Sequence, residues 1–116
     1  MKPAEQRWSP LLPPDDPAQH RVYKVRTKVV RWKGASGWHF ATLPVKPAAL
    51  IKARFGATAR GWGSIRVRIR VGDTEWDTSL FPDRRAKSYL FAIKAAVRKA
   101  EDLSHGDTIT AHIHVM

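Results

Sequence analysis

The sequence of 116 residues contains no cysteine, which excludes disulfide bonds, thiolate metal sites and a cysteine nucleophile. It also has no run of about 18 apolar residues, the length that a membrane-spanning helix requires. The first 20 residues lack the apolar segment of a secretory signal peptide. We therefore expect a cytoplasmic protein.

Acidic residues are absent between Pro17 and Gly72, although 13 lysines and arginines lie in that interval. The rest of the chain is nearly balanced, so the whole formal net charge of +11 comes from this interval. Such asymmetry favours a polyanionic partner or an acidic surface. A proteome of generally basic proteins would produce the same composition, and both explanations stay open here.

The sequence shows no arrangement of residues that is typical of a catalytic centre. Asp77 and Ser79 fall on one strand face, but no histidine lies in register to complete a triad. The stretch 61–63 has too few glycines, and no following helix, to cradle a phosphate. His112 and His114 share a strand face without a third residue at metal-ligand spacing. We expect no metal and no other cofactor, and we favour a binding protein over an enzyme.

Prolines concentrate near the start of the chain, where five of the eight fall within residues 1–17. Because that segment has no hydrophobic period, residues 1–20 are expected to form a disordered or loosely docked tail. The length and the hydrophobic content of 43% suit a single core. We therefore predict one domain over residues 21–116.

Strand-like alternation begins after His20. In residues 21–33, apolar or small side chains from Tyr23 to Val29 share one face, and basic side chains occupy the other. The alternation shifts at Val29-Val30, which indicates a bulge or a strong bend. The basic residues without a local acidic partner are Arg21, Lys24, Arg26, Lys28, Arg31 and Lys33.

A β-hairpin is predicted in the stretch "IRVRIRVGDTEWDTSL", because Gly72-Asp73 separates two alternating runs as a two-residue turn. The predicted pairs are Val71 with Thr74, Arg70 with Glu75, Ile69 with Trp76, Arg68 with Asp77, and Arg66 with Ser79. Ile69 and Trp76 then face the core. Two arginines gain a carboxylate opposite them, which favours a cross-strand ladder over a ligand site. Only Arg66 lacks an acidic partner.

Two short helices and three further strands complete the prediction. The first helix begins near the prolines at 44 and 47 and ends at Gly56, with Leu50, Ile51 and Phe55 on one side. The second covers roughly 94–102. Its expected buried residues are Ala96, Val97 and Ala100. Strands are expected over 38–43, with His39 exposed, over 89–93, and over 108–115, where Ile109, Ala111, Ile113 and Val115 point one way.

The two helical segments share an order of elements. Gly56 follows Leu43 by 13 positions, and Gly106 follows Ile93 by 13 positions. In each case a short strand precedes the helix and a long alternating strand follows it. This order predicts a pseudo-symmetric β-barrel of two related halves with a helix at each end.

The second of these segments resembles the swapped-hairpin motif of the AbrB and MazE class of DNA-binding proteins. The residues that carry the likeness are Ile93, Arg98, Leu103, Gly106-Asp107 and Ile109. The sequence departs from that class at Lys94, where proline is usual, and at Glu101, where an apolar residue is usual. Members of the class bind DNA as dimers, whereas here both half-motifs would lie in one chain.

From about residue 22 onward, the chain resembles a more specific group, the bacterial domain-of-unknown-function family nineteen-oh-five. The stretches that carry this likeness are "WHFATLP", "GWGSIRVRI", "WDTSLFP" and "YLFAIKAAVRKAEDLSHGDTITAHIHV". The resemblance implies a double-split β-barrel, which is a mainly β fold with two short helices. It implies no biochemical activity.

A basic half interleaved with Trp32, Trp38 and Trp62 offers both phosphate contacts and stacking surfaces. Sheet packing is the alternative for these tryptophans, and Trp76 is assigned to the core. We predict a small binding module, monomeric or homodimeric, with nucleic acid or another polyanion as partner. The alternatives are a small-ligand or protein-interaction barrel and an undetected hydrolase. The candidate polyanion-binding residues are Lys24, Arg26, Lys28, Arg31, Lys33 and Arg66.

Overall fold

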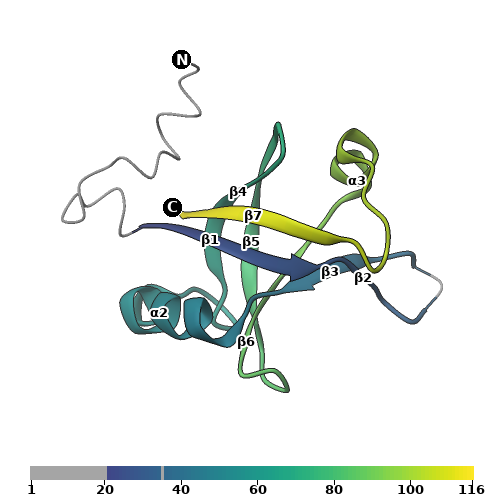
Figure 1. The fold of residues 1–116 in the computed structure, drawn as a ribbon. Helices are drawn as coiled ribbons and strands as arrows, with labels where there is room; N and C mark the ends of the chain where they lie inside the picture. The colour runs from purple at the N-terminus through teal and green to yellow at the C-terminus, as the bar shows by residue number, and fades with distance from the viewer. Residues whose placement is uncertain (1–20, 35) are drawn as a thin grey trace, which may run out of the picture.

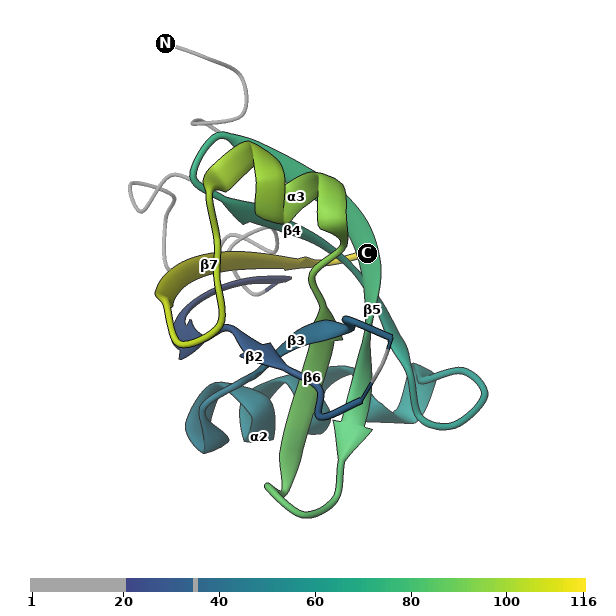
Figure 2. The same cartoon turned by 90° about the vertical axis from the view of Figure 1, so that its right-hand side faces the viewer.

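The computed structural model describes residues 21–34 and 36–116. Over these residues the chain is mainly β, with two α-helices and one curled antiparallel sheet that forms half of a barrel (Figures 1 and 2). The predicted fold class is therefore confirmed, while the predicted tail over residues 1–20 lies outside the described residues. The strands are β1 (Val22–Lys28), β2 (Val30–Arg31), β3 (His39–Thr42), β4 (Ile65–Val71), β5 (Thr74–Asp83), β6 (Ser88–Ala92) and β7 (Thr108–Val115). The helices are α2 (Val45–Phe55), the short 3-10 helix η2 (Gly56–Thr58) and α3 (Ala95–Glu101).

The two halves of the chain use the same order of elements. In the first half, β3 leads into α2 and then β4, and in the second half β6 leads into α3 and then β7. The sheet order β1-β7-β4-β5-β6-β3-β2 pairs β3 with β6 and β4 with β7, each strand with its counterpart. The two helices lie at opposite ends of the sheet (Figures 1 and 2). This is the arrangement that the repeated strand–helix–strand order predicts.

The shift in alternation at Val29 marks the place where the chain changes its pairing partner. β1 pairs with β7 as far as Lys28, and β2 pairs with β3. Between them, buried Val29 donates its N–H to the Asp107 carbonyl at 2.9 Å and accepts from the Gly106 N–H at 2.8 Å. The predicted bend is thus confirmed. It allows one continuous segment to contribute to both ends of the sheet.

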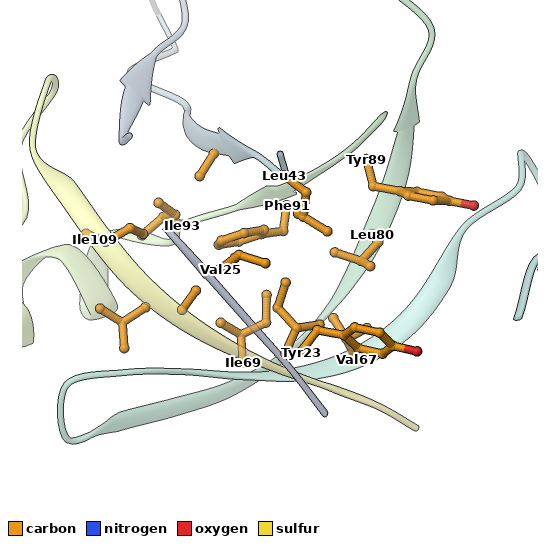
Figure 3. Close-up of a cluster of buried hydrophobic side chains, with 14 of the residues drawn as sticks. Tyr23, Val25, Leu43, Val67, Ile69, Leu80, Tyr89, Phe91, Ile93 and Ile109 are labelled. Atoms are coloured by element: carbon orange, nitrogen blue, oxygen red, sulfur yellow. The ribbon is translucent and has the colours of Figure 1, made fainter. Parts of the chain in front are cut away.

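The core fills the concave side of the sheet (Figure 3). Every strand except the two-residue β2 places apolar side chains there, including the four predicted for the last strand, Ile109, Ala111, Ile113 and Val115. Phe91 is fully buried and lies opposite the small Ala41 on β3, so this cross-strand pair combines a large side chain with a small one. Trp76 packs against Phe91 with ring centroids 6.3 Å apart, which confirms its predicted place in the core.

The hairpin of β4 and β5 has the predicted register at every pair, from Val71 opposite Thr74 to Arg66 opposite Ser79. Gly72 begins the turn with a φ of 59°. This left-handed conformation carries little steric cost for glycine and a substantial one for other residues. The two-residue turn therefore determines which side chains of both strands face the core.

The helices differ from the prediction in which residues they bury. In α2, Ala48 and Ile51 are buried, whereas Leu50 is exposed, so the prediction for Leu50 was wrong. In α3, Val97 is the one buried residue, and the predicted burial of Ala96 and Ala100 was also wrong. α3 has only seven residues and contacts the start of β5, near Thr74, so little of its surface is covered. No helix among the described residues is long and apolar enough to span a membrane.

Candidate functional site

Strand β1 directs a row of basic side chains away from the core. Tyr23 and Val25 are buried, and alternation therefore places Lys24, Arg26 and Lys28 on the opposite, exposed side. The row ends at Lys28 because the pairing with β7 ends there. These are the first three of the six residues that the sequence indicates as candidates.

Strand β7 connects this row to the arginines of β4. Lys24 lies opposite His112 on β7, and His112 lies opposite Arg70 on β4. Glu75 on β5 follows across from Arg70, so that four strands contribute to one continuous row. Because alternation keeps these positions on the same side of the sheet, the basic strand and the arginine strand share one face.

A second row runs parallel to the first. His114 lies opposite Arg68, which lies opposite Asp77. Arg68 Nε and Asp77 Oδ1 form an ion pair at 2.7 Å, which confirms the predicted ladder at this position. The pKa of Arg68 is raised, chiefly by its hydrogen bond to Asp77. Arg66 donates to the Ser79 hydroxyl at 3.3 Å, also as the predicted pairing requires.

We define the outer face as the side of β1, β7, β4 and residues 74–80 of β5 that points away from the core. Its charged residues are Lys24, Arg26, Lys28, Arg66, Arg68, Arg70, Glu75 and Asp77. Two acidic residues lie on β5, at one side, and the basic ones extend over β1 and β4. His112 and His114 lie between these two basic strands. Sequence reasoning missed this role for β7, because strand order is not a local property of the sequence.

The electrostatic effect of this crowding is visible at His112. Its pKa is lowered, first by burial and then by the positive charges of Arg70 and Lys24. The imidazole is therefore neutral at neutral pH. Among the described residues, no group of three or more histidine, aspartate or glutamate side chains is arranged to hold a metal ion.

The structure places the remaining two candidates, Arg31 and Lys33, elsewhere. Arg31 lies on β2 opposite His39, and its backbone N–H donates to His105 Nδ1 at 2.9 Å. Lys33 follows in the loop after β2 and is exposed. Neither takes part in the β1–β7–β4–β5 pairing that forms the outer face.

His39 is buried, with 9% of its surface exposed, so its predicted exposure was wrong. Its Nδ1 donates to the Gly37 carbonyl at 2.6 Å. Inward alternation continues from His39 through Ala41 to Leu43, and the neighbouring aromatic residues are therefore on the outside. The large rings of Trp38 and Phe40 favoured an inward position for these two residues and an outward one for His39. In the structure, Phe91 fills the interior at this point instead.

Exposed tryptophans occur in two places among the described residues. Trp32, Trp38 and Phe40 form a cluster around the loop between β2 and β3, with the Trp38 and Phe40 rings stacked at 4.9 Å and Trp32 5.7 Å from Trp38. Trp62 stands apart on the loop before β4 and is 93% exposed. None of these three tryptophans is buried in the core, in contrast to Trp76.

The described residues form a small β half-barrel, which is a curled antiparallel sheet with a helix at each end. Basic side chains lie on its convex side. Residues 26–113 match the family described as "Domain of unknown function (DUF1905)". The match covers most of the chain, and the protein belongs to this family. This confirms the family that the sequence resembles. No curated protein matches the chain.

Proposed function

We propose that the outer face binds a polyanion, and that nucleic acid is the polyanion concerned. One observation carries the proposal: β7 pairs with β1 on one side and with β4 on the other. Two runs of basic residues that are about 40 positions apart in the chain thereby contribute to the same face.

The spacing of the sheet suits a partner with closely placed negative charges. Side chains on one face of a strand recur about every 6.8 Å, and neighbouring strands are about 4.8 Å apart. Six basic and two acidic residues on such a grid leave a net positive face. Lysine and arginine contacts to phosphates release counterions, and this release supplies much of the affinity of such complexes.

The test is fluorescence anisotropy with labelled mixed-sequence DNA and RNA, measured from about 50 to 200 mM salt with heparin as competitor. If 6–10 phosphates are contacted, affinity should fall by roughly 10³–10⁵ over that range. We expect binding that persists near physiological salt and that prefers one nucleic acid to heparin. Loss of all binding at the upper salt, or equal competition by heparin, would reduce the effect to nonspecific charge.

Two triple variants locate the binding. Lys24→Gln, Arg26→Gln and Lys28→Gln together remove three charges from the outer face, at positions exposed on β1. Lys46→Gln, Lys94→Gln and Lys99→Gln together remove the same charge from exposed positions on or beside the helices. The first triple should weaken binding strongly and lower the salt slope, whereas the second should change it little. Equal losses in both variants would contradict the proposal.

A protein-interaction module is the second candidate, and one observation favours it. The rings of Trp32, Trp38 and Phe40 lie together, and Trp32 and Trp38 are exposed beside β2 and β3. If this cluster joins two copies of the chain, sedimentation velocity should show a dimer that Trp38→Ser converts to a monomer. A monomer at all concentrations would remove self-association as the role of the cluster.

A further inference from the structure

An open groove of about 1010 Å³ lies between α2, the segment 56–63 and the turn that joins β5 to β6. Its residues belong to elements that contribute no candidate residue to the outer face, apart from the end of β5. The side of α2 that lines it carries Ala49, Lys52 and Ala53, whereas Ile51 faces the core. Small side chains leave the helix surface flat. The volume is at the upper end of the range for small-molecule sites, about 300–1000 Å³.

Tyr89 contributes a polar group to the wall of this groove. Only 6% of the surface of this residue is exposed, and it belongs to the core cluster as well as to the groove lining. The hydroxyl points out of the core (Figure 3). Burial raises the pKa of Tyr89, so the phenol remains a neutral O–H donor.

The Tyr89 hydroxyl has no hydrogen-bond partner among the described residues, and this sets it apart from the other core tyrosine. The Tyr23 hydroxyl accepts a hydrogen bond from Arg54 Nη1 at 3.0 Å. The Tyr89 ring is buried, but its hydroxyl is not fully enclosed, so the O–H donor is accessible from the groove. A group that enters the groove from solvent can supply the missing partner.

The charged residues that line the groove are mostly cationic. Lys52 on α2 and Arg84 and Lys87 on the β5–β6 turn are exposed, and their side chains make no hydrogen bond or ion pair within residues 21–34 and 36–116. The acidic residue in the lining, Asp83, already accepts from the Ala86 N–H at 3.2 Å and from the Thr42 hydroxyl at 3.4 Å. The groove therefore favours a negatively charged ligand.

Trp62 provides a flat apolar surface beside these cations. It is 93% exposed, although its loop is well fixed: Arg60 and Ser64 exchange two backbone hydrogen bonds of 2.9 Å. Gly63 rests against Pro82, because a Cβ at that position would lie 3.0 Å from Pro82 Cγ. An indole presented to solvent on a fixed turn is a stacking surface for a ring.

We infer that this groove binds a small anion that carries a flat aromatic ring. The ring lies between Trp62 and the alanine side of α2. Its carboxylate or phosphate group contacts Lys52, Arg84 and Lys87. The Tyr89 hydroxyl donates a hydrogen bond to an acceptor on the ligand. A nucleotide and an aromatic carboxylic acid share this chemistry.

The experiment is an NMR titration of the ¹⁵N-labelled full chain with two pairs of probes. The first pair is AMP and adenosine, and the second is indole-3-carboxylate and indole-3-carboxamide. We expect an anionic probe to shift amides of residues 48–63 and 82–89, and its uncharged partner to bind more weakly. AMP alone as ligand would indicate a nucleotide, and indole-3-carboxylate alone would indicate an aromatic acid. If neither anion binds, or if the uncharged partner binds equally well, the inference is overturned.

Two substitutions test the residues. Tyr89→Phe removes one oxygen and keeps the core ring, and it should weaken binding about three- to tenfold. Trp62→Ala removes the stacking surface and should weaken binding about five- to a hundredfold. Trp32→Ala is the matched control, because Trp32 is an exposed tryptophan outside the groove lining.

An unchanged dissociation constant in both Tyr89→Phe and Trp62→Ala would overturn the inference, and so would shifts confined to the outer face. If Tyr89→Phe alters the unfolding midpoint, Lys52→Gln at an exposed position provides the second test of the groove. The Lys24, Arg26 and Lys28 triple variant should bind the small anion normally. A failure of the groove inference can therefore be distinguished from a failure of the polyanion proposal.

Discussion

The Thr74 hydroxyl donates a hydrogen bond of 2.6 Å to Glu101 Oε2 across 27 positions of the chain. The bond joins the last residue of α3 to the turn of the β4–β5 hairpin. A carboxylate in the last turn of a helix is disfavoured by the helix dipole. The contact with Thr74 offsets that cost, and it places the carboxylate directly over Gly72.

We predict that Gly72→Ala destabilises the protein more than a comparable glycine substitution. A Cβ at Gly72 would overlap Glu101 Oε1, so the Glu101 carboxylate would have to move away from its hydrogen bond with Thr74, in addition to the left-handed φ of 59°. The conformation alone should cost about 1–2 kcal/mol. Gly37→Ala is the control, because Gly37 has a φ of 70° and no atom within 4 Å of its Cβ position. Urea denaturation measures both losses.

The contact with Glu101 can be separated from the backbone strain by a double-mutant cycle. Glu101→Ala removes the carboxylate, so the loss caused by Gly72→Ala should be smaller in that background. Additive losses, or equal losses for Gly72→Ala and Gly37→Ala, would contradict the steric explanation.

We predict that Thr27→Val lowers stability by opening the contact between β1 and β3. The Thr27 hydroxyl donates to the Thr42 carbonyl at 2.6 Å, and this bond joins two strands that do not pair in the sheet. Valine keeps the shape and removes the donor, at a cost of about 0.5–1.5 kcal/mol. Thr108→Val, at an exposed position of β7, is the control. Similar urea midpoints for the two variants would show that the bond contributes nothing.

Much of the fold could be predicted because it depends on local patterns. The turn Gly72-Asp73 determines the hairpin register, and the shift at Val29 reveals a change of strand partner. Both signals are local, because a two-residue turn allows few strand registers and a two-residue period allows only two choices of buried face. The buried face of each long strand follows from the same period.

Other features depend on packing between distant segments. His39 is buried, and Trp38 and Phe40 are outside, because Phe91 occupies the interior opposite Ala41. Leu50 is exposed because α2 covers the sheet through Ala48 and Ile51 only. The outer face and the groove could not be predicted for the same reason. They depend on β7 lying between β1 and β4, and on a loop and a helix meeting the β5–β6 turn.

We predict that His112 makes stability depend on pH. The groups around it are Lys24 on β1 and Arg70 on β4, with Glu75 beyond Arg70 on β5. Burial and the two cations lower its pKa from the ordinary value of 6.5. The unfolded chain therefore takes up a proton first as pH falls. The stability that neutral His112 provides is complete above about pH 6.5 and is lost as pH falls toward and through the folded pKa.

His112→Gln should accordingly reduce the difference in urea midpoint between about pH 7.5 and about pH 5.5. An NMR titration of the imidazole supplies the direct measurement, with a pKa below 6.5 expected. A value at or above 6.5, or an unchanged pH dependence in the variant, would contradict the assignment.

Our last prediction concerns Asp77, and it follows from the proposed function. Asp77 pairs with Arg68 at 2.7 Å and adds negative charge to the outer face. Asp77→Asn should release Arg68 for contact with a phosphate and raise the affinity for nucleic acid. One additional phosphate contact would steepen the slope of log affinity against log salt by about 0.9 for duplex DNA. Asp102→Asn, an equal change of charge at the exposed end of α3, should leave the slope unchanged. If both variants shift affinity equally, binding responds to net charge alone, and the pairing of Arg68 with Asp77 has no part in it.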